Sequence, residues 1–142
     1  MKIVIDTNVA VSGLLWGGPP NQILKWARGD VLEAIGCEET LEEIRHVLKY
    51  KKFAKRIAHL DTSPGEVIAY FMNLLRFVPS PSAIPNAIPE DPFDNIFLAL
   101  AFDNDAVLVV SGDKHLLNLE AYEGIQIVSP GEATAIIETL RV

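Results

Sequence analysis

The stretch KIVIDTN, residues 2–8, joins a short apolar run to an acid and sets the interpretation of the whole chain. Three β-branched residues in succession indicate a buried strand, and Asp6 follows them directly. The stretch VLVVSGD, residues 107–113, has the same arrangement and ends at Asp113. Two strands of a small sheet that both lead into a carboxylate favour a shared acidic site.

On either side of these two stretches, strands and helices alternate along the chain. Runs of β-branched and apolar residues predict strands at residues 2–5, 31–35, 106–110 and 125–128. Apolar spacing and capping sequences predict five helices. Two have predicted ranges, residues 23–27 and 64–75, and three have predicted starts, at Thr40, Asp91 and residue 129. The proline-rich residues 79–92 are predicted to form an ordered loop. This alternation is typical of a parallel sheet covered on both faces. We therefore expect an α/β fold, a three-layer α/β/α sandwich with a central, mostly parallel sheet.

Length and composition set further bounds on the protein. The 142 residues fit one domain over residues 1–142, and 49% hydrophobic with 22% charged residues is ordinary for a globular domain. No apolar run reaches the ~20 residues that span a membrane, and no signal-peptide pattern precedes the first strand. The single cysteine, Cys37, forms no internal disulfide. We expect a cytoplasmic protein without a membrane segment.

The charge is unevenly distributed along the chain. The net charge is −7, which by itself argues against a nucleic-acid partner. Half of the basic residues nevertheless fall in one stretch, namely Arg45, Lys49, Lys51, Lys52, Lys55 and Arg56. This stretch is either a solvated helix face or a patch that contacts phosphates, and the sequence leaves both interpretations open.

Four acids are candidates for one site. Ligands of parallel α/β folds bind at the carboxyl ends of the strands, where Asp6 and Asp113 are expected. Helices begin at the same edge of the sheet, and Asp94 falls in the first turn of the apolar helix. Glu43 falls in the first turn of the helix that follows the second predicted strand.

The last two acids also have purely structural interpretations. Asp94 fits a capping arrangement with Asp91 at the start of its helix. Glu43 fits a capping box with Thr40, in the pattern T-x-x-E. The sequence alone leaves these alternatives open.

Four carboxylates in one crevice repel one another, so they take up protons or bind a cation. An all-oxygen site suits Mg²⁺ or Mn²⁺, and a water bound to such an ion can attack a phosphodiester. The three histidines are scattered along the chain and no Cys/His set indicates zinc. Neither a phosphate-binding G-x-x-x-x-G-K-[ST] loop nor a G-x-G-x-x-G turn is present, which disfavours ATPase and dinucleotide-binding functions.

These residues carry a resemblance to the PIN-domain family, and within it to toxins of the VapC type from toxin–antitoxin systems. The matching segments are IVIDTNVAVSGLL, EETLEEIRHVL, DPFDNIFLALA, LVVSGDKHLL and IQIVSPGEA. They cover essentially the whole chain and occur in the order that the family has.

The resemblance implies a Mg²⁺- or Mn²⁺-dependent endoribonuclease and assigns residues to its site. The family's four motif acids fall on Asp6, Glu43, Asp94 and Asp113, with Asp91 as a neighbour of the third. Its polar residue after the first acid falls on Asn8, and its small hydroxyl residue before the fourth acid falls on Ser111, both as hydrogen-bonding support for the carboxylates. Cys37 stands where many relatives carry serine. The implied partners are an RNA substrate, a cognate antitoxin whose tail covers the crevice, and a second copy in a homodimer.

Three alternative functions remain. The chain could be a PIN-fold protein of RNA processing, or a catalytically quiet PIN domain that acts as a binding module. An acidic-pocket phosphotransfer protein is the third, but such phosphatases use D-x-D after the first strand, where this chain has DTN at residues 6–8.

Overall fold

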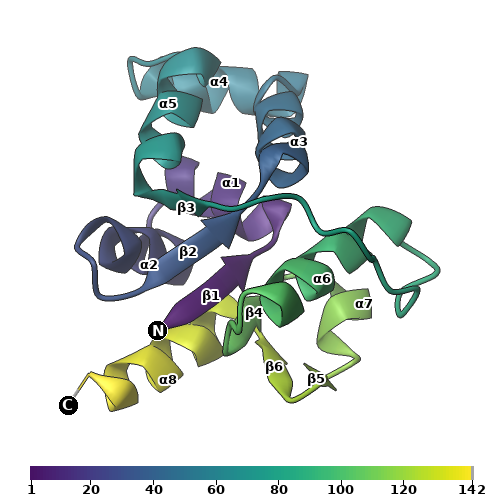
Figure 1. Cartoon of the computed structure of the whole chain (residues 1–142). Coiled ribbons are helices and arrows are strands. Elements are labelled where there is room, and N and C mark those ends of the chain that lie inside the picture. The colour runs from purple at the N-terminus through teal and green to yellow at the C-terminus, as the bar shows by residue number, and fades with distance from the viewer. Residues whose placement is uncertain (142) are drawn as a thin grey trace.

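A six-stranded sheet runs through the centre of the computed structural model, which describes residues 1–141 (Figure 1). Its strands lie in the order β3-β2-β1-β4-β6-β5. The strands are β1 (Lys2–Ile5), β2 (Glu33–Gly36), β3 (Leu75–Phe77), β4 (Leu108–Val110), β5 (Ala121–Tyr122) and β6 (Ile125–Val128). All neighbouring pairs are parallel except β5 with β6, which is antiparallel. The mostly parallel sheet confirms the expected α/β architecture.

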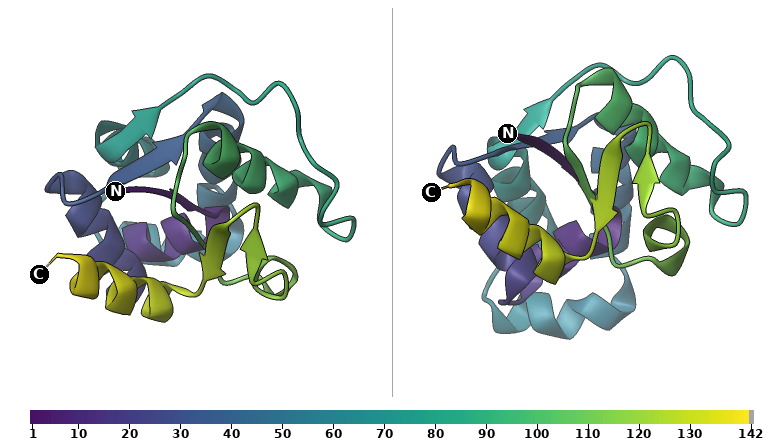
Figure 2. Two further views of the ribbon diagram at one scale, coloured as in Figure 1. Left: turned by 60° about the horizontal axis from the view of Figure 1, so that its bottom comes forward. Right: turned by 90° about the horizontal axis from the view of Figure 1, so that it is seen from below.

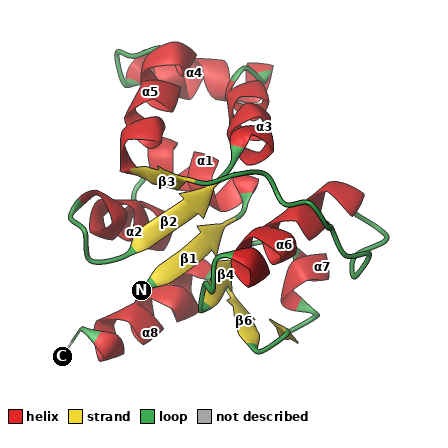
Figure 3. Ribbon diagram, viewed as in Figure 1, coloured by secondary structure: helices red, strands yellow, loops and turns green. Residues whose placement is uncertain are grey.

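Helices cover both faces of this sheet (Figure 3). They are α1 (Thr7–Leu15), α2 (Pro19–Arg28), α3 (Glu38–Leu48), α4 (Lys51–His59), α5 (Pro64–Leu74), the 3₁₀ turn η1 (Pro92–Asp94), α6 (Asn95–Asp103), α7 (Lys114–Leu117) and α8 (Pro130–Leu140). Figure 2 shows α6 and α8 on opposite faces of the sheet. In Figure 1, α3, α4 and α5 extend beyond the sheet on the side of α1.

Side-chain alternation along the strands divides the apolar core into two layers. Ile3 and Ile5 point into the larger layer, which includes residues of α1, α2, α3, α5 and α8. Val4 points into the smaller layer, which includes residues of α6 and α7. The near-continuous apolar run of β1 is explained by its central place, because a strand covered on both faces buries both sets of side chains.

The predicted elements are largely present, but several boundaries differ. The second strand begins at Glu33 rather than at residue 31, and the fourth strand begins at Leu108 rather than at residue 106. The helix expected from Thr40 already begins at Glu38. Leu75 does not continue the preceding helix, because it pairs with Ala34 as the first residue of an edge strand.

Five elements were not predicted from the sequence, namely α1, α4, α7, β3 and β5. The α1 sequence TNVAVSGLL contains valines and a glycine, which disfavour a helix on propensity alone. The Asp6 side chain compensates by accepting a hydrogen bond from the Val9 amide at the helix start. The two SPGE sequences do cap helices as expected, with Ser63 and Ser129 accepting from amides three residues later.

No helix among residues 1–141 is long and apolar enough to cross a membrane.

Candidate functional site

The strand register brings the first and last motif acids to one edge of the sheet. Strands β1 and β4 are parallel neighbours, and Ile5 pairs with Val110 at their carboxyl ends. Asp6 follows the first of these strands directly, and Asp113 lies three residues beyond the second. Their sequence separation is large, but the pairing fixes their proximity.

Asp6 is held in a buried position with every carboxylate oxygen engaged. Its side chain is only 3% exposed. Oδ1 accepts from the Val9 amide at 2.8 Å, while Oδ2 accepts from the Ser111 hydroxyl at 2.5 Å and from the Gly112 amide at 3.3 Å. Burial raises the pKa of Asp6, and these hydrogen bonds oppose the rise because they stabilise the ionised form.

Ser111 links the two strand-end acids through its hydroxyl group. The hydroxyl donates to Asp6 and accepts from the Asp113 amide at 2.9 Å. The Asp113 carboxylate in turn accepts from the His115 amide at 2.7 Å and caps α7. Both strand-end acids therefore cap the helix that follows them and face the same site.

Asp91 and Asp94 approach the site from η1 at the start of α6. One carboxylate oxygen from each of Asp91, Asp94 and Asp113 lies within 4.8 Å of the other two, a spacing that could hold a metal ion. Carboxylate oxygens are the ligands that Mg²⁺ and Mn²⁺ prefer, so the donor set fits the ion that the family resemblance implies.

Asp94 experiences the charge of the whole cluster. Its pKa is raised to about 7, chiefly by burial and then by the charges of Asp113, Asp6, Asp91 and Glu43, in that order of importance. Glu43 of α3 contributes least, and it is not among the acids whose oxygens lie within 4.8 Å of one another. Asp6, Asp94 and Asp113 therefore gather with Asp91 at the carboxyl edge of the sheet, and the charge of Glu43 reaches Asp94 from α3.

The capping box considered for Glu43 is wrong, whereas Asp94 does lie in the first turn of η1 behind the N-cap Asp91. Cys37, not Thr40, is the N-cap of α3, and the Thr40 hydroxyl accepts from the Cys37 amide at 3.0 Å. Glu43 therefore lies beyond the first turn of α3. Within the described chain, the side chains of Asp91 and Asp94 make no capping hydrogen bond at η1 or α6.

Asn95 holds the segment that carries Asp91 and Asp94, a role that was not predicted from the sequence. Its side chain is 2% exposed and makes four hydrogen bonds. The amide oxygen accepts from Ala87 and Ile88, and the amide nitrogen donates to the carbonyls of Ile88 and Pro92. The available signal was a polar residue heading a helix that is otherwise apolar almost all round.

His115 is a second residue whose place was not foreseen. Its Nε2 lies 3.8 Å from the Asp91 carboxylate, at the rim of the acidic cluster. Asn8, in contrast, is exposed on the first turn of α1, and its side chain takes part in none of the hydrogen bonds found within residues 1–141 that hold the cluster.

The basic stretch divides between α3 and α4. The Arg45 guanidinium lies 3.4 Å from the Glu42 carboxylate, and Arg56 donates from Nε to the Leu15 carbonyl at 2.7 Å. Exposed lysines make up the rest, namely Lys49, Lys51, Lys52 and Lys55. In Figure 1, α4 lies beyond the end of α3 that is remote from the sheet. The lysines of α4 are therefore separated from the acidic cluster by the length of α3.

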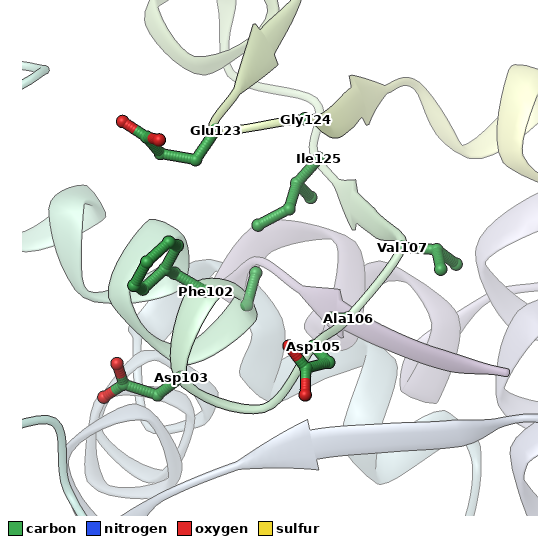
Figure 4. A pocket seen from close by; sticks show the side chains of 9 residues that line it. Phe102, Asp103, Asp105, Ala106, Val107, Glu123, Gly124 and Ile125 are labelled. Carbon is green, nitrogen blue, oxygen red and sulfur yellow. The ribbon is translucent and has the colours of Figure 1, made fainter.

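A hollow of about 590 Å³ lies away from the acidic cluster, at the end of α6 and the starts of β4 and β6. Its lining includes Phe102, Asp105, Glu123 and Ile125 (Figure 4). None of the five motif and neighbouring acids lines it.

Two solved structures share this fold. PAE2754 from Pyrobaculum aerophilum superposes with a TM-score of 0.61 at 13% identity, covering 98% of this chain and 90% of its own. A chain of VapBC2 from Rickettsia felis, solved bound to a DNA fragment from their promoter, superposes with a TM-score of 0.59 at 14% identity, covering 91% of this chain and 98% of its own. A search of curated proteins finds no match.

The sequence itself matches a family model described as the PIN domain over residues 2–115. This range contains all the acids of the cluster, from Asp6 to Asp113, and it extends to His115. The chain therefore belongs to the PIN domain family.

Proposed function

We propose that the protein is a metal-dependent endoribonuclease of the VapC toxin type, which hydrolyses RNA phosphodiester bonds. The observation that carries this proposal is the crowding of carboxylates at the carboxyl edge of the sheet, where the pKa of Asp94 is raised to about 7. Structural acids are seldom gathered in this way, because each added charge destabilises the others. A bound divalent cation would offset the repulsion among the carboxylates, and the cluster would then be a metal-binding site.

Each carboxylate has a role set by its position. Asp94 and Asp113, together with Asp91, present oxygens close enough to hold one Mg²⁺ or Mn²⁺ ion. Asp6 is more buried than these three acids and contributes negative charge to the site. Its own oxygens accept hydrogen bonds from Ser111 and two backbone amides. When bound, the ion would supply a water of lowered pKa and neutralise charge on the phosphate.

Glu43 would orient the attacking water from the α3 side of the cluster. Unlike the other acids, it lies on α3, and its charge reaches Asp94. His115 lies beside Asp91, where it would bind a phosphate oxygen or the leaving group. Ser111 would keep Asp6 and Asp113 in their mutual orientation, a supporting role that commonly matters for metal affinity.

Partners follow from the same proposal. We infer an RNA substrate whose backbone contacts the exposed lysines of α3 and α4, and a cognate antitoxin that covers the acidic cluster. The Rickettsia felis neighbour, VapBC2, supports the second inference. A homodimer is the symmetric assembly we expect for a domain of this size.

The test is cleavage of an RNA panel by the pure protein with Mn²⁺, Mg²⁺ or EDTA. Glu43→Gln and its neighbour Glu42→Gln form a matched pair, because both lie on α3 but only Glu43 affects Asp94. We expect the Glu43 variant to lose cleavage and the exposed Glu42 variant to retain it. Equal loss in both variants, or cleavage that persists in EDTA, would contradict the proposal.

A catalytically quiet PIN domain is the second candidate. The Arg56 and Lys-rich surface would also serve a protein that binds RNA without cutting it. Calorimetric titration with Mn²⁺ distinguishes the quiet PIN domain from the nuclease. A catalytically quiet site should bind little Mn²⁺, whereas a nuclease site made of these carboxylates should bind Mn²⁺ and release protons from Asp94.

A further inference from the structure

Trp16 stands at the end of α1 with its ring exposed but held in place. The residue is 42% exposed. Arg56 of α4 donates to the carbonyl of the preceding residue, Leu15, and its guanidinium lies 5.5 Å from the Trp16 ring centroid. Phe53 of the same helix meets the indole edge to face, with centroids 6.1 Å apart. A tryptophan ring that is contacted by two residues of one helix and is still partly open to solvent offers a flat apolar surface to a ligand.

Positive charge is concentrated on α4, the helix that contacts this ring. Lys51, Lys52 and Lys55 are exposed on α4, which contains no acidic residue, and the Lys52 ammonium lies 5.1 Å from the Phe53 ring centroid. Among residues 1–141, none of these three lysines takes part in an ion pair. Since the chain carries a net charge of −7, an uncompensated cluster of cations indicates an anionic ligand. We refer to Trp16, Lys51, Lys52, Phe53, Lys55 and Arg56 as the aromatic–basic platform.

We propose that the aromatic–basic platform binds single-stranded RNA, with one base stacked on Trp16 and the adjacent phosphates held by the lysines of α4. Stacking surfaces beside backbone-tracking cations are the two components by which proteins bind single strands. A duplex hides the faces of its bases, and an acidic protein segment has no need of an exposed indole. This proposal rests on the proposed function and names the form of RNA that the site receives.

Helix α3 connects the platform with the acidic cluster. The charge of Glu43 on this helix reaches Asp94, and the exposed Lys49, about 9 Å further along, is the residue at which α3 ends, next to α4. Helix α1 spans the same interval, because Asp6 is its N-cap and Trp16 its C-cap, about 15 Å apart along the helix. One extended RNA strand can therefore contact both surfaces, with the scissile phosphate at the acids and a flanking base on Trp16.

The test measures binding separately from cleavage. Fluorescence anisotropy with a fluorescein-labelled, twelve-nucleotide 2′-O-methyl oligoadenylate in EDTA reports affinity where no cleavage occurs. We expect Trp16→Ala to lower the affinity by about 5- to 150-fold, the range found for loss of one base-stacking side chain. Tyr70→Ala is the matched control, because Tyr70 is also 42% exposed with a guanidinium, that of Arg28, 6.0 Å from its ring centroid. We expect its affinity to equal that of the unaltered protein.

An abasic oligonucleotide of the same length separates stacking from charge. The unaltered protein should bind the base-bearing strand more tightly than the abasic strand, and Trp16→Ala should remove that preference. Lys52→Ala and Lys55→Ala should weaken binding of both strands and lower the slope of log affinity against log salt by about 0.7 for each phosphate that is no longer neutralised. Trp16→Leu, which keeps apolar packing against Phe53, should show the same weakening as Trp16→Ala and guards against an unfolded variant.

Equal affinity for abasic and base-bearing strands overturns the proposal, and so does unaltered affinity in both Trp16 variants. Equal affinity for a duplex of the same length would likewise contradict it. The two proposals fail separately. If the unaltered protein binds RNA as described but does not cleave it, the proposed nuclease function is contradicted and the proposed aromatic–basic platform is supported. If it cleaves RNA but its binding does not depend on Trp16, the proposed platform is contradicted and the nuclease function is supported.

Discussion

Replacing Asp94 by asparagine should stabilise the metal-free protein at alkaline pH. The pKa of Asp94 is raised from 3.8 to about 7 in the folded protein. Below pH 3.8 the carboxyl is protonated in both states. Between pH 3.8 and about 7 only the unfolded chain ionises it, so its contribution to the free energy of unfolding falls as the pH rises through this window. Asparagine matches the shape of the protonated carboxyl and carries no charge at any pH.

The size of the effect follows from the pKa. Each pKa unit corresponds to about 1.36 kcal/mol, so the rise to about 7 sets a ceiling of about 4 kcal/mol. Asp94 is only half-buried, and solvent screening reduces such contributions, so we expect about 2 kcal/mol. In urea unfolding with EDTA, Asp94→Asn should exceed the stability of the unaltered protein by about 0.8 kcal/mol at pH 5 and by about 2 kcal/mol at pH 8, because the loss begins near pH 3.8.

Two comparisons make this prediction specific. Asp61→Asn alters an exposed acid with a positive φ that asparagine also adopts, and it should show no such dependence on pH. Added Mn²⁺ at about 100 times its Kd should stabilise the unaltered protein at pH 8 by about 2.7 kcal/mol and the Asp94 variant by much less. If Asp94→Asn gains no stability between pH 5 and pH 8, the carboxylates do not crowd one another and the electrostatic argument is wrong.

Two further substitutions test the support of the acidic cluster. Ser111→Ala removes the hydroxyl that donates to Asp6 and accepts from the Asp113 amide, so calorimetry should show Mn²⁺ affinity lowered by about 10- to 100-fold; an unchanged affinity would show that the linkage is unimportant. Asn95→Ala leaves buried backbone groups near Ile88 without partners, and urea unfolding should show a loss of about 2–3 kcal/mol. Hydrogen exchange at Ala87 and Ile88 should also accelerate, and slow exchange there would contradict the anchoring role.

The parts of the fold that could be predicted from the sequence are those with strong local patterns. The apolar runs of β1 and β6 and the SPGE caps are visible without any knowledge of neighbours. Strand β3 was missed because only three residues pair at the sheet edge, and Leu75 there fits a helical pattern equally well. Helix α1 was missed because its stability comes from the Asp6 cap and from burial rather than from propensity.

The candidate site divides in the same way. Asp6 and Asp113 were identifiable because each follows an apolar run, and their proximity required only that the two strands be neighbours. The place of His115 beside Asp91 depends on how α7 turns against η1, which no local pattern encodes. The stacking of Arg56 on Trp16 joins residues 40 positions apart, and the sequence alone therefore indicated a basic patch without its aromatic component.

The most direct measurement is anomalous diffraction from crystals of the protein grown with Mn²⁺ near pH 8. We predict a Mn²⁺ peak bounded by the carboxylates of Asp91, Asp94 and Asp113, above the buried Asp6. An acidic cluster without such a peak at saturating Mn²⁺, or a peak only at other residues, would contradict the claim that a divalent cation makes this gathering of charge stable.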